Sequence, residues 1–415
     1  MARNKKKKKQ AYCSSQQEQR TRMNVFYRNM YNILAAYQCE EFVGLMPQSL
    51  KRALYNMRTP SFRFTEANCP DINREQYNEI IQMVSYTLKK MTISLNDSDG
   101  KTTLSDFYTM GYNLRILQEA TQTHPYENGE RMHELLTTRL NLLAADEKAM
   151  LMLANICHYA SAYFSSYTNY VVTVHPEFPS ESSKKGMQGL QLIVSTHKVP
   201  VHYFKVNGHI RPAFAIGLTA PERQLKWLSM NRALFDHTPF HDQLQTPVYV
   251  QSHTFQRLAE RLDLMTIKEL YFDLRNSILR ATVIRYKRYH LIEYRALDCK
   301  LGYLVADLID GKLLVKTFLF LPSDGTPEGE KLEQLCGLTK VDMQYLKIDH
   351  LSAFHHTDIK EDARLKKLFC DAGCESLFDF CERQRNKNCR HDQLSSYIIQ
   401  YIQLDQEEEQ PAIAG

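Results

Sequence analysis

One helical segment of the sequence combines residue types that can move protons and hold a phosphate. His253, Arg257 and Arg261 follow one another at steps of four residues. On an α-helix such a step drifts by only about 40°, so the three side chains share one face over two turns. An imidazole exchanges a proton near neutral pH, and a guanidinium can bind two oxygens of one phosphate. This face is therefore the first candidate site.

The same segment also has an apolar side. Leu258 and Leu262 are spaced to pack inward, so we expect a helix with one face in the core and one basic face. A structural interpretation remains open beside the functional one. His253 or a neighbouring hydroxyl residue would then cap the helix, and the two arginines would pair with Glu260, Asp263 or other carboxylates.

A basic, tyrosine-rich stretch follows this helix. Residues 275–300 contain seven Lys or Arg and two acidic residues, which gives a local net charge of +5. Cations fix phosphates, and aromatic rings stack on unpaired bases, so this mixture suits single-stranded RNA. The alternative is a strand whose outer face is only solvated. The predicted nucleic-acid-binding residues are Arg285, Lys287, Arg288, Tyr289 and Tyr294.

Three strands are predicted at residues 289–296, 301–308 and 312–321. Asp310-Gly311 lies between the last two and is typical of a tight hairpin turn. The last of these strands contains Thr317. The order is therefore a basic helix followed by antiparallel strands, the last of which carries a hydroxyl residue.

This order and the H-x3-R-x3-R pattern resemble small bacterial ribonuclease toxins of the barnase–EndoU–colicin–RelE group. The resemblance covers about residues 248–322, under a fifth of the chain. It implies helices packed on a curved antiparallel sheet, with metal-independent RNA cleavage at the sheet. Under this resemblance His253, Arg257 and Arg261 match the helix motif, and Thr317 matches the hydroxyl residue of the last strand. These four residues are the predicted catalytic set.

Metal-independent cleavage of RNA needs a base for the 2′-hydroxyl and an acid for the 5′-oxygen. His253 is one acid–base group for two proton transfers, so His290 or Tyr294 is the natural candidate for the second acid–base group. The leading hypothesis is an RNA-directed protein that is a candidate metal-independent endoribonuclease. The alternative is a non-enzymatic protein that binds protein or nucleic acid on the same scaffold. We expect RNA, or a protein partner or inhibitor, and no cofactor.

The rest of the chain must position this segment, and its first part is predicted to be a bundle of five or six helices. Apolar residues there recur at steps of three and four, as one buried stripe of a helix requires. The stripes are Phe26, Met30, Ile33, Leu34 and Tyr37; Tyr77, Ile80, Ile81, Val84 and Leu88; and Leu136, Leu140, Leu143 and Ala144.

The predicted fold class is α+β, with a helical N-terminal domain, a central helix-plus-antiparallel-sheet domain and a helical C-terminal extension. A Pro-, Ser- and Gly-rich segment at residues 175–189 is the predicted linker. The predicted boundaries are residues 1–20 for a disordered basic tail, 21–174 for the helical domain, 187–325 for the α+β domain, 326–403 for the extension and 404–415 for a disordered acidic tail.

The composition is that of a globular protein. Of 415 residues, 43% are hydrophobic and 24% charged, and ten cysteines are scattered rather than arranged as a disulfide framework. The basic start is followed by polar residues, and no apolar run approaches about 20 residues. We therefore expect a cytoplasmic protein with reduced thiols, no secretory signal and no association with a membrane.

Two clusters, one at residues 236–242 and one at residues 370–391, contain residue types that can bind a metal. Neither has a spacing that suits a metal site. Pro239 interrupts the first cluster, and apolar residues surround the second, whose thiols we expect to be buried. No nucleotide-binding glycine loop and no serine-hydrolase motif is present. We therefore predict no metal site. The first cluster is Asp236, His237, His241 and Asp242, and the second is Cys370, Cys374, Cys381, Cys389 and His391.

Overall fold

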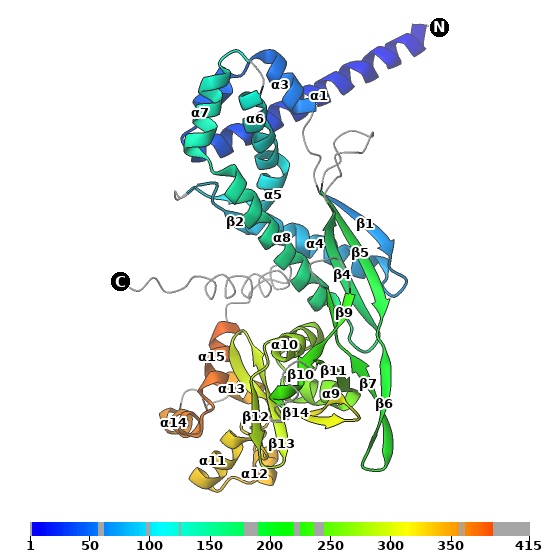
Figure 1. Ribbon diagram of the computed structural model, residues 1–415, viewed down its shortest axis with the longest axis vertical. Coiled ribbons are helices and arrows are strands. Elements are labelled where there is room, and N and C mark those ends of the chain that lie inside the picture. The colour runs from blue at the N-terminus through cyan, green and yellow to red at the C-terminus, as the bar shows by residue number, and fades with distance from the viewer. Residues whose placement is uncertain are drawn as a thin grey trace. The chain divides into compact units, whose positions relative to one another are not determined.

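The computed structural model describes residues 2–56, 62–96, 100–123, 126–177, 190–219, 225–235, 245–356, 359 and 362–384. The protein belongs to the α+β class, as predicted (Figure 1). It divides into two compact units. The first comprises Met1–Thr65, Ile81–Ile156 and Pro176–Ile193, and the second comprises Glu66–Ile80, Cys157–His175 and Val194–Gly415.

The chain passes between these units several times, whereas the sequence suggested one linker. The helices α4 (Arg74–Lys90) and α8 (Leu142–Phe164) each contribute residues to both units. A search for segments rich in Pro, Gly and Ser cannot detect a boundary that falls inside a helix.

The first unit is largely helical, as predicted. The helix α1 begins at Ala2, within the segment for which disorder was predicted, because the Lys- and Gln-rich start consists of good helix formers. The other elements of this part are α2 (Glu41–Leu45), α3 (Gln48–Asn56), β2 (Thr92–Ile93), β3 (Thr102–Thr103), α5 (Leu104–Asp106), the π-helix η1 (Phe107–Gly111), α6 (Tyr112–Thr123) and α7 (Gly129–Arg139).

The predicted apolar stripes lie in the core, except for Ile81, which is half-buried, and the end of the third stripe. Met30, Leu34 and Val84 are fully buried. The third stripe was wrong at its end, because Leu143 is 61% exposed and Ala144 is also exposed. The helix α7 ends at Arg139, the next residue Leu140 is extended, and α8 begins at Leu142. The helical phase is therefore lost between the two halves of that stripe.

Three strands form a sheet in the order β1 (Arg63–Asn68), β5 (Gln191–Lys198) and β4 (Tyr170–Glu177). The sequence did not predict β1 within the helical region. Its residues are mostly exposed, so they show no alternation of apolar and polar positions. β4 and β5 lie on either side of the segment 178–189, which falls outside the described residues.

The second unit contains an eight-stranded sheet. Its order is β12-β13-β14-β15-β11-β7-β6, with β10 paired to β11. β14 and β15 are antiparallel, as predicted, but β11 and β15 are parallel, so the sheet is mixed. The strands are β6 (Val201–Val206), β7 (His209–Ala215), β10 (Ser229–Asn231), β11 (Gln245–Gln251), β12 (Val283–Tyr286), β13 (Tyr289–Ala296), β14 (Cys299–Ile309) and β15 (Lys312–Phe320). A small separate ribbon joins β8 (Gly217–Thr219) to β9 (Leu225–Trp227).

Two helices lie between β11 and β12, and the first of them confirms the predicted helix that carries His253, Arg257 and Arg261. They are α9 (Ser252–Arg261) and α10 (Ile267–Leu279). Thr266 and Glu269 form a reciprocal capping box that fixes the start of α10. The helical extension is described as far as Gln384 and comprises α11 (Pro327–Cys336), α12 (Lys340–Tyr345), α13 (Ser352–His356), α14 (Ala363–Ala372) and α15 (Glu375–Gln384).

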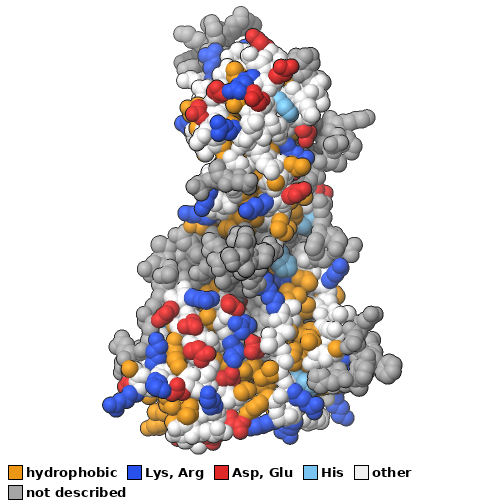
Figure 2. Space-filling view, turned by 60° about the vertical axis from the view of Figure 1, so that its left-hand side comes forward, with side chains coloured by type: hydrophobic (Ala, Val, Ile, Leu, Met, Phe, Trp, Pro, Cys, Tyr) orange, Lys and Arg blue, Asp and Glu red, His pale blue; other side chains and the backbone are white. Residues whose placement is uncertain are grey.

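On the face that Figure 2 shows, Lys and Arg side chains alternate with Asp and Glu side chains. The described part of the chain has no helix that combines the length and apolarity needed to cross a membrane. The eight cysteines whose side chains the structure describes are free thiols. The predicted acidic tail and the residues 385–403 of the extension lie outside the described residues.

Candidate functional site

The four residues of the predicted catalytic set line one pocket of about 190 Å³ in the second unit. His253, Arg257 and Arg261 come from α9, and Thr317 comes from β15. The sequence separates the helix from Thr317 by more than fifty residues, so their convergence is a property of the fold. The other lining residues are Phe318, Leu319, Phe320, Ser323, Asp324, Lys340, Met343, Gln344 and Asp349.

The parallel pairing of β11 and β15 explains this convergence. Val248 lies opposite Leu313, and Val250 lies opposite Val315. Thr317 lies two residues beyond Val315 on β15, and Ser252, the first residue of α9, lies two residues beyond Val250. The pocket therefore opens at the carboxyl ends of two neighbouring parallel strands, the edge at which sheets of α and β structure commonly bind ligands.

The helix α9 is oriented by its buried side. The Thr254 hydroxyl donates to the Val315 carbonyl at 3.3 Å, and Leu258 and Leu262 are fully buried. His253 and Arg257 are half-buried on the other side. The predicted division into a core face and a basic face is therefore confirmed. The N-cap position is Gln251, whose side chain makes no capping hydrogen bond, so the interpretation of His253 or a neighbouring hydroxyl residue as the cap is wrong.

Arg257 retains most of its capacity to bind an anion. Its side chain is 39% exposed and its Nη1 donates to Glu260 Oε2 at 2.8 Å, one turn away on the same helix. An exposed pair of this kind contributes little free energy because solvent screens it. A phosphate that enters the pocket can therefore compete for the Arg257 guanidinium at small cost.

Arg261 is engaged by a buried carboxylate. Its Nη1 donates to Asp349 Oδ2 and, at 3.1 Å, to the Asp349 backbone carbonyl. The Arg261 side chain is 15% exposed and that of Asp349 is 8% exposed. Arg261 therefore forms part of the pocket wall with its charge compensated. The structural alternative is confirmed for both arginines, because Arg257 pairs with Glu260 and Arg261 pairs with another carboxylate, that of Asp349. Asp263 instead accepts hydrogen bonds from Ser352.

The same carboxylate holds a second ring. His350 Nδ1 lies 2.6 Å from Asp349 Oδ1, so Asp349 bridges an arginine and a histidine. Burial, with the nearby Arg261 charge, lowers the pKa of His350. This histidine is therefore biased toward its neutral form.

The C-terminal extension closes one side of the pocket. Lys340, Met343 and Gln344 of α12 line it, and the Leu351 backbone N–H donates to the Arg261 carbonyl at 2.8 Å. Sequence reasoning missed this wall. The Thr339 capping box marks the start of α12, but nothing local in the sequence indicates that α12 lies beside α9.

The predicted nucleic-acid-binding residues lie outside this pocket. Arg285 is exposed on β12, the strand at one end of the sheet order. Lys287 Nζ lies 3.1 Å from Glu330, and Arg288 Nε donates to the Tyr289 hydroxyl at 2.9 Å. The Arg288 guanidinium also lies over the Tyr289 ring. These residues form a basic edge of the sheet, separate from the pocket beside α9.

Tyr294 was wrongly assigned to nucleic-acid binding. Its side chain is fully buried, and its hydroxyl donates to the Leu270 carbonyl of α10 at 3.2 Å. Its ring packs edge-to-face on Phe318. No base can stack on a tyrosine in this position. His290, the other candidate for a second acid–base group, packs on Phe235 and does not line the pocket.

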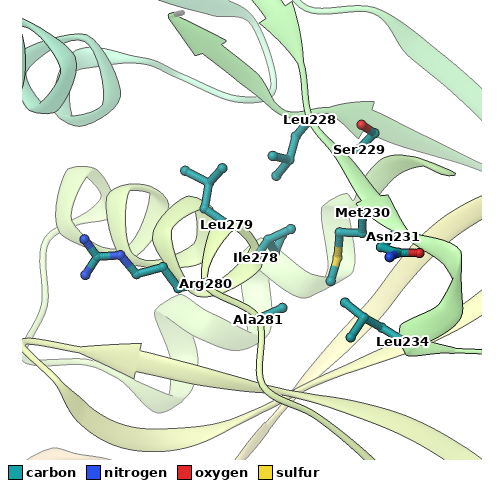
Figure 3. A pocket seen from close by; sticks show the side chains of 9 residues that line it. All are labelled: Leu228, Ser229, Met230, Asn231, Leu234, Ile278, Leu279, Arg280 and Ala281. Atoms are coloured by element: carbon teal, nitrogen blue, oxygen red, sulfur yellow. The ribbon is translucent and has the colours of Figure 1, made fainter. Parts of the chain in front are cut away.

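A second hollow, of about 350 Å³, lies between β10 and the end of α10. Figure 3 shows Leu228 and Met230 facing Ile278, with Arg280 extending away from them. Its lining combines apolar side chains with Ser229, Asn231 and Arg280 and includes none of the predicted residues. Within the described residues there is no group of three His, Cys, Asp or Glu that could hold a metal ion. Residues 236–242, the first of the two clusters for which no metal was predicted, and Cys389 with His391 of the second lie outside those residues.

No family model, no curated protein and no solved structure matches this chain.

Proposed function

We propose that this protein binds single-stranded RNA and holds a backbone phosphate in the pocket between His253, Arg257 and Thr317. The observation that carries the proposal is the convergence of these three side chains at the carboxyl ends of β11 and β15. Together they offer a guanidinium, an imidazole and a hydroxyl, which are suitable donors for phosphate oxygens. Lys340, exposed on α12, adds a further cation at the rim.

Binding is favoured over cleavage by what surrounds the imidazole. His253 is the one histidine in the pocket lining, and Asp349 engages Arg261. Cleavage requires one group to take the 2′-hydroxyl proton and a second to protonate the leaving 5′-oxygen. Neither sequence candidate for the second group, His290 or Tyr294, lines the pocket.

Metal-independent cleavage is the second candidate function. It is supported by the position of His253 beside Arg257, since a guanidinium stabilises the charge that a pentavalent phosphorane gains. His253 would take the proton of the 2′-hydroxyl, whose oxygen attacks phosphorus to give a 2′,3′-cyclic phosphate. The 5′-oxygen would leave with a proton from a second acid.

One experiment tests both candidates. The full-length protein is titrated with a labelled 12-residue oligouridine, and a second sample is incubated with RNA in chelator. We expect Arg257→Ala to weaken binding by roughly tenfold or more, because it removes a charged hydrogen bond, and Thr317→Val to weaken it by a few-fold. The control Arg364→Ala removes an exposed arginine on α14 and should leave the affinity unchanged.

Two outcomes would contradict the proposal. The first is equal affinity of wild type and Arg257→Ala, and the second is an equal loss in Arg364→Ala. Chelator-resistant cleavage that disappears in His253→Ala would replace the binding function by the enzymatic one. Absence of cleavage together with a loss of affinity in Arg257→Ala would support binding.

A further inference from the structure

The β6–β7 hairpin extends past the sheet at the edge where the pocket opens. β7 pairs with β11 over three residues, and the last of these pairs is Gln251 with Ala213. β6 and β7 stay paired beyond this point as far as Val206 and His209. At about 3.3 Å per residue, the turn lies roughly 16 Å beyond the end of β11. Figure 1 shows this hairpin as a projecting arm.

One face of the arm is on the same side of the sheet as α9. Side chains that lie opposite one another, or two apart on a strand, share a face. Phe214 packs on Phe255 of α9, with ring centroids 6.5 Å apart, so its face is turned toward that helix. The register places further residues on this face, namely Val201, Tyr203, Lys205, Ile210 and Pro212.

This face, which we call the arm stripe, is exposed although it is largely apolar. Tyr203 is 65% exposed, Ile210 is 73% exposed and Val201 is 43% exposed. The opposite face of the hairpin is different, because Phe204 is buried and packs on Tyr249. The exposed apolar side chains of the hairpin are therefore confined to the face on the side of α9.

The charged residues of the hairpin and of the segments that flank it in sequence are all positive. Residues 190–219 contain Lys198, Lys205 and Arg211 and no Asp or Glu. Lys205 is exposed, and no ion pair is found for it within the described residues. An acid-free projection with an exposed tyrosine beside a lysine complements a chain of phosphates that carries unpaired bases.

We propose that the arm stripe binds the RNA strand as it leaves the pocket. Tyr203 stacks on an unpaired base, and the Lys205 ammonium contacts a backbone phosphate. This inference rests on the proposed function for the identity of the strand, but it concerns a different surface. It predicts that the protein distinguishes RNA length, because a short oligonucleotide fills the pocket without reaching the arm.

The test compares a 3-residue and a 12-residue oligouridine on the full-length protein. Removal of one stacking contact costs about 1–3 kcal/mol, so Tyr203→Ala should weaken binding of the longer RNA by roughly 5- to 150-fold. Binding of the shorter RNA should stay unchanged. Lys205→Ala should weaken binding of the longer RNA by a smaller factor.

Arg211→Ala is the matched control. Arg211 lies opposite Phe204, so it occupies the other face of the same hairpin and carries the same charge as Lys205. We expect it to bind both RNAs as the wild type does. An equal loss in Arg211→Ala and Lys205→Ala would overturn the arm stripe in favour of unspecific charge, and unchanged binding in Tyr203→Ala would overturn it outright.

The outcomes separate this inference from the proposed function. If Arg257→Ala weakens the binding of both RNAs and Tyr203→Ala weakens the binding of neither, the pocket is supported and RNA binding by the arm stripe is refuted. If Tyr203→Ala weakens the binding of the longer RNA and Arg257→Ala leaves the affinity for both RNAs unchanged, phosphate binding in the pocket is refuted. If neither RNA binds the wild-type protein, both the proposed function and the arm stripe as an RNA-binding surface are refuted. A Tyr203→Ala protein that loses self-association instead of RNA affinity would identify a second copy of the chain as the occupant.

Discussion

Arg261 donates hydrogen bonds to both the side chain and the backbone carbonyl of Asp349. This contact joins the basic helix α9 to the segment that follows α12 and makes the third residue of the H-x3-R-x3-R pattern a structural one. The anion-binding capacity of the helix is therefore concentrated at His253 and Arg257. Each of the following predictions depends on a particular contact of this kind.

Loss of the Asp349 carboxylate should destabilise the second unit. Asp349→Ala leaves the Arg261 guanidinium 15% exposed without its carboxylate, and breaking a buried pair typically costs about 3–5 kcal/mol. The free energy of unfolding, measured by urea denaturation, should fall by an amount of this order. The double variant Arg261→Met, Asp349→Leu should recover much of it, since no unpaired charge then remains. An Asp349→Ala protein as stable as the wild type would refute the structural role of the pair.

Substitution of Tyr294 should lower the stability of the protein without changing its affinity for RNA. Tyr294→Phe removes the hydroxyl that donates to the Leu270 carbonyl. That carbonyl keeps its intrahelical hydrogen bond within α10, so we expect a loss of about 1 kcal/mol in the free energy of unfolding. The affinity for the 12-residue oligouridine, measured under native conditions, should not change. A loss of affinity without a loss of stability would restore the original assignment of this residue.

His158 should make the protein less stable in acid. Burial, together with the Arg275 charge, lowers the pKa of His158 from 6.5 to about 3, and Arg275 Nη2 lies 2.6 Å from its Nε2. Between these two pKa values the unfolded chain binds a proton that the folded protein does not. Stability is therefore unaffected above pH 6.5 and decreases as the pH falls through this window, by up to about 1.4 kcal/mol per pH unit.

His158→Gln keeps a hydrogen-bond acceptor but cannot titrate. Urea denaturation at pH 7, 6 and 5 should show a smaller loss of stability in this variant than in the wild type. Parallel curves for the two proteins would contradict the assigned pKa.

Local sequence patterns predicted the elements whose causes are local. Asp310-Gly311 forms the predicted hairpin turn, and Asn207-Gly208 forms a second turn of the same kind. Both have positive φ at both residues, the conformation that these residue types favour. The apolar spacing of α9 likewise predicted which side of the helix is buried. In these cases the deciding interactions lie within a few residues of one another.

Non-local contacts were beyond such reasoning. The parallel pairing of β11 with β15 joins strands more than sixty residues apart, and Asp349 meets Arg261 across 88 residues. Tyr294 shows the same limit, because a strand of alternating residues does not reveal which face is covered. The pocket was therefore predictable in its α9 and β15 residues and unpredictable in the wall that α12 contributes.

The most direct test of the phosphate-binding pocket is the salt dependence of RNA affinity. Each phosphate contact to a single strand contributes about 0.7 to the slope of log affinity against log salt concentration. Titrations of the 12-residue oligouridine at several salt concentrations should give Arg257→Ala a slope smaller in magnitude by about 0.7 than that of the wild type and of Arg364→Ala. The same slope in all three proteins would contradict a phosphate contact at Arg257.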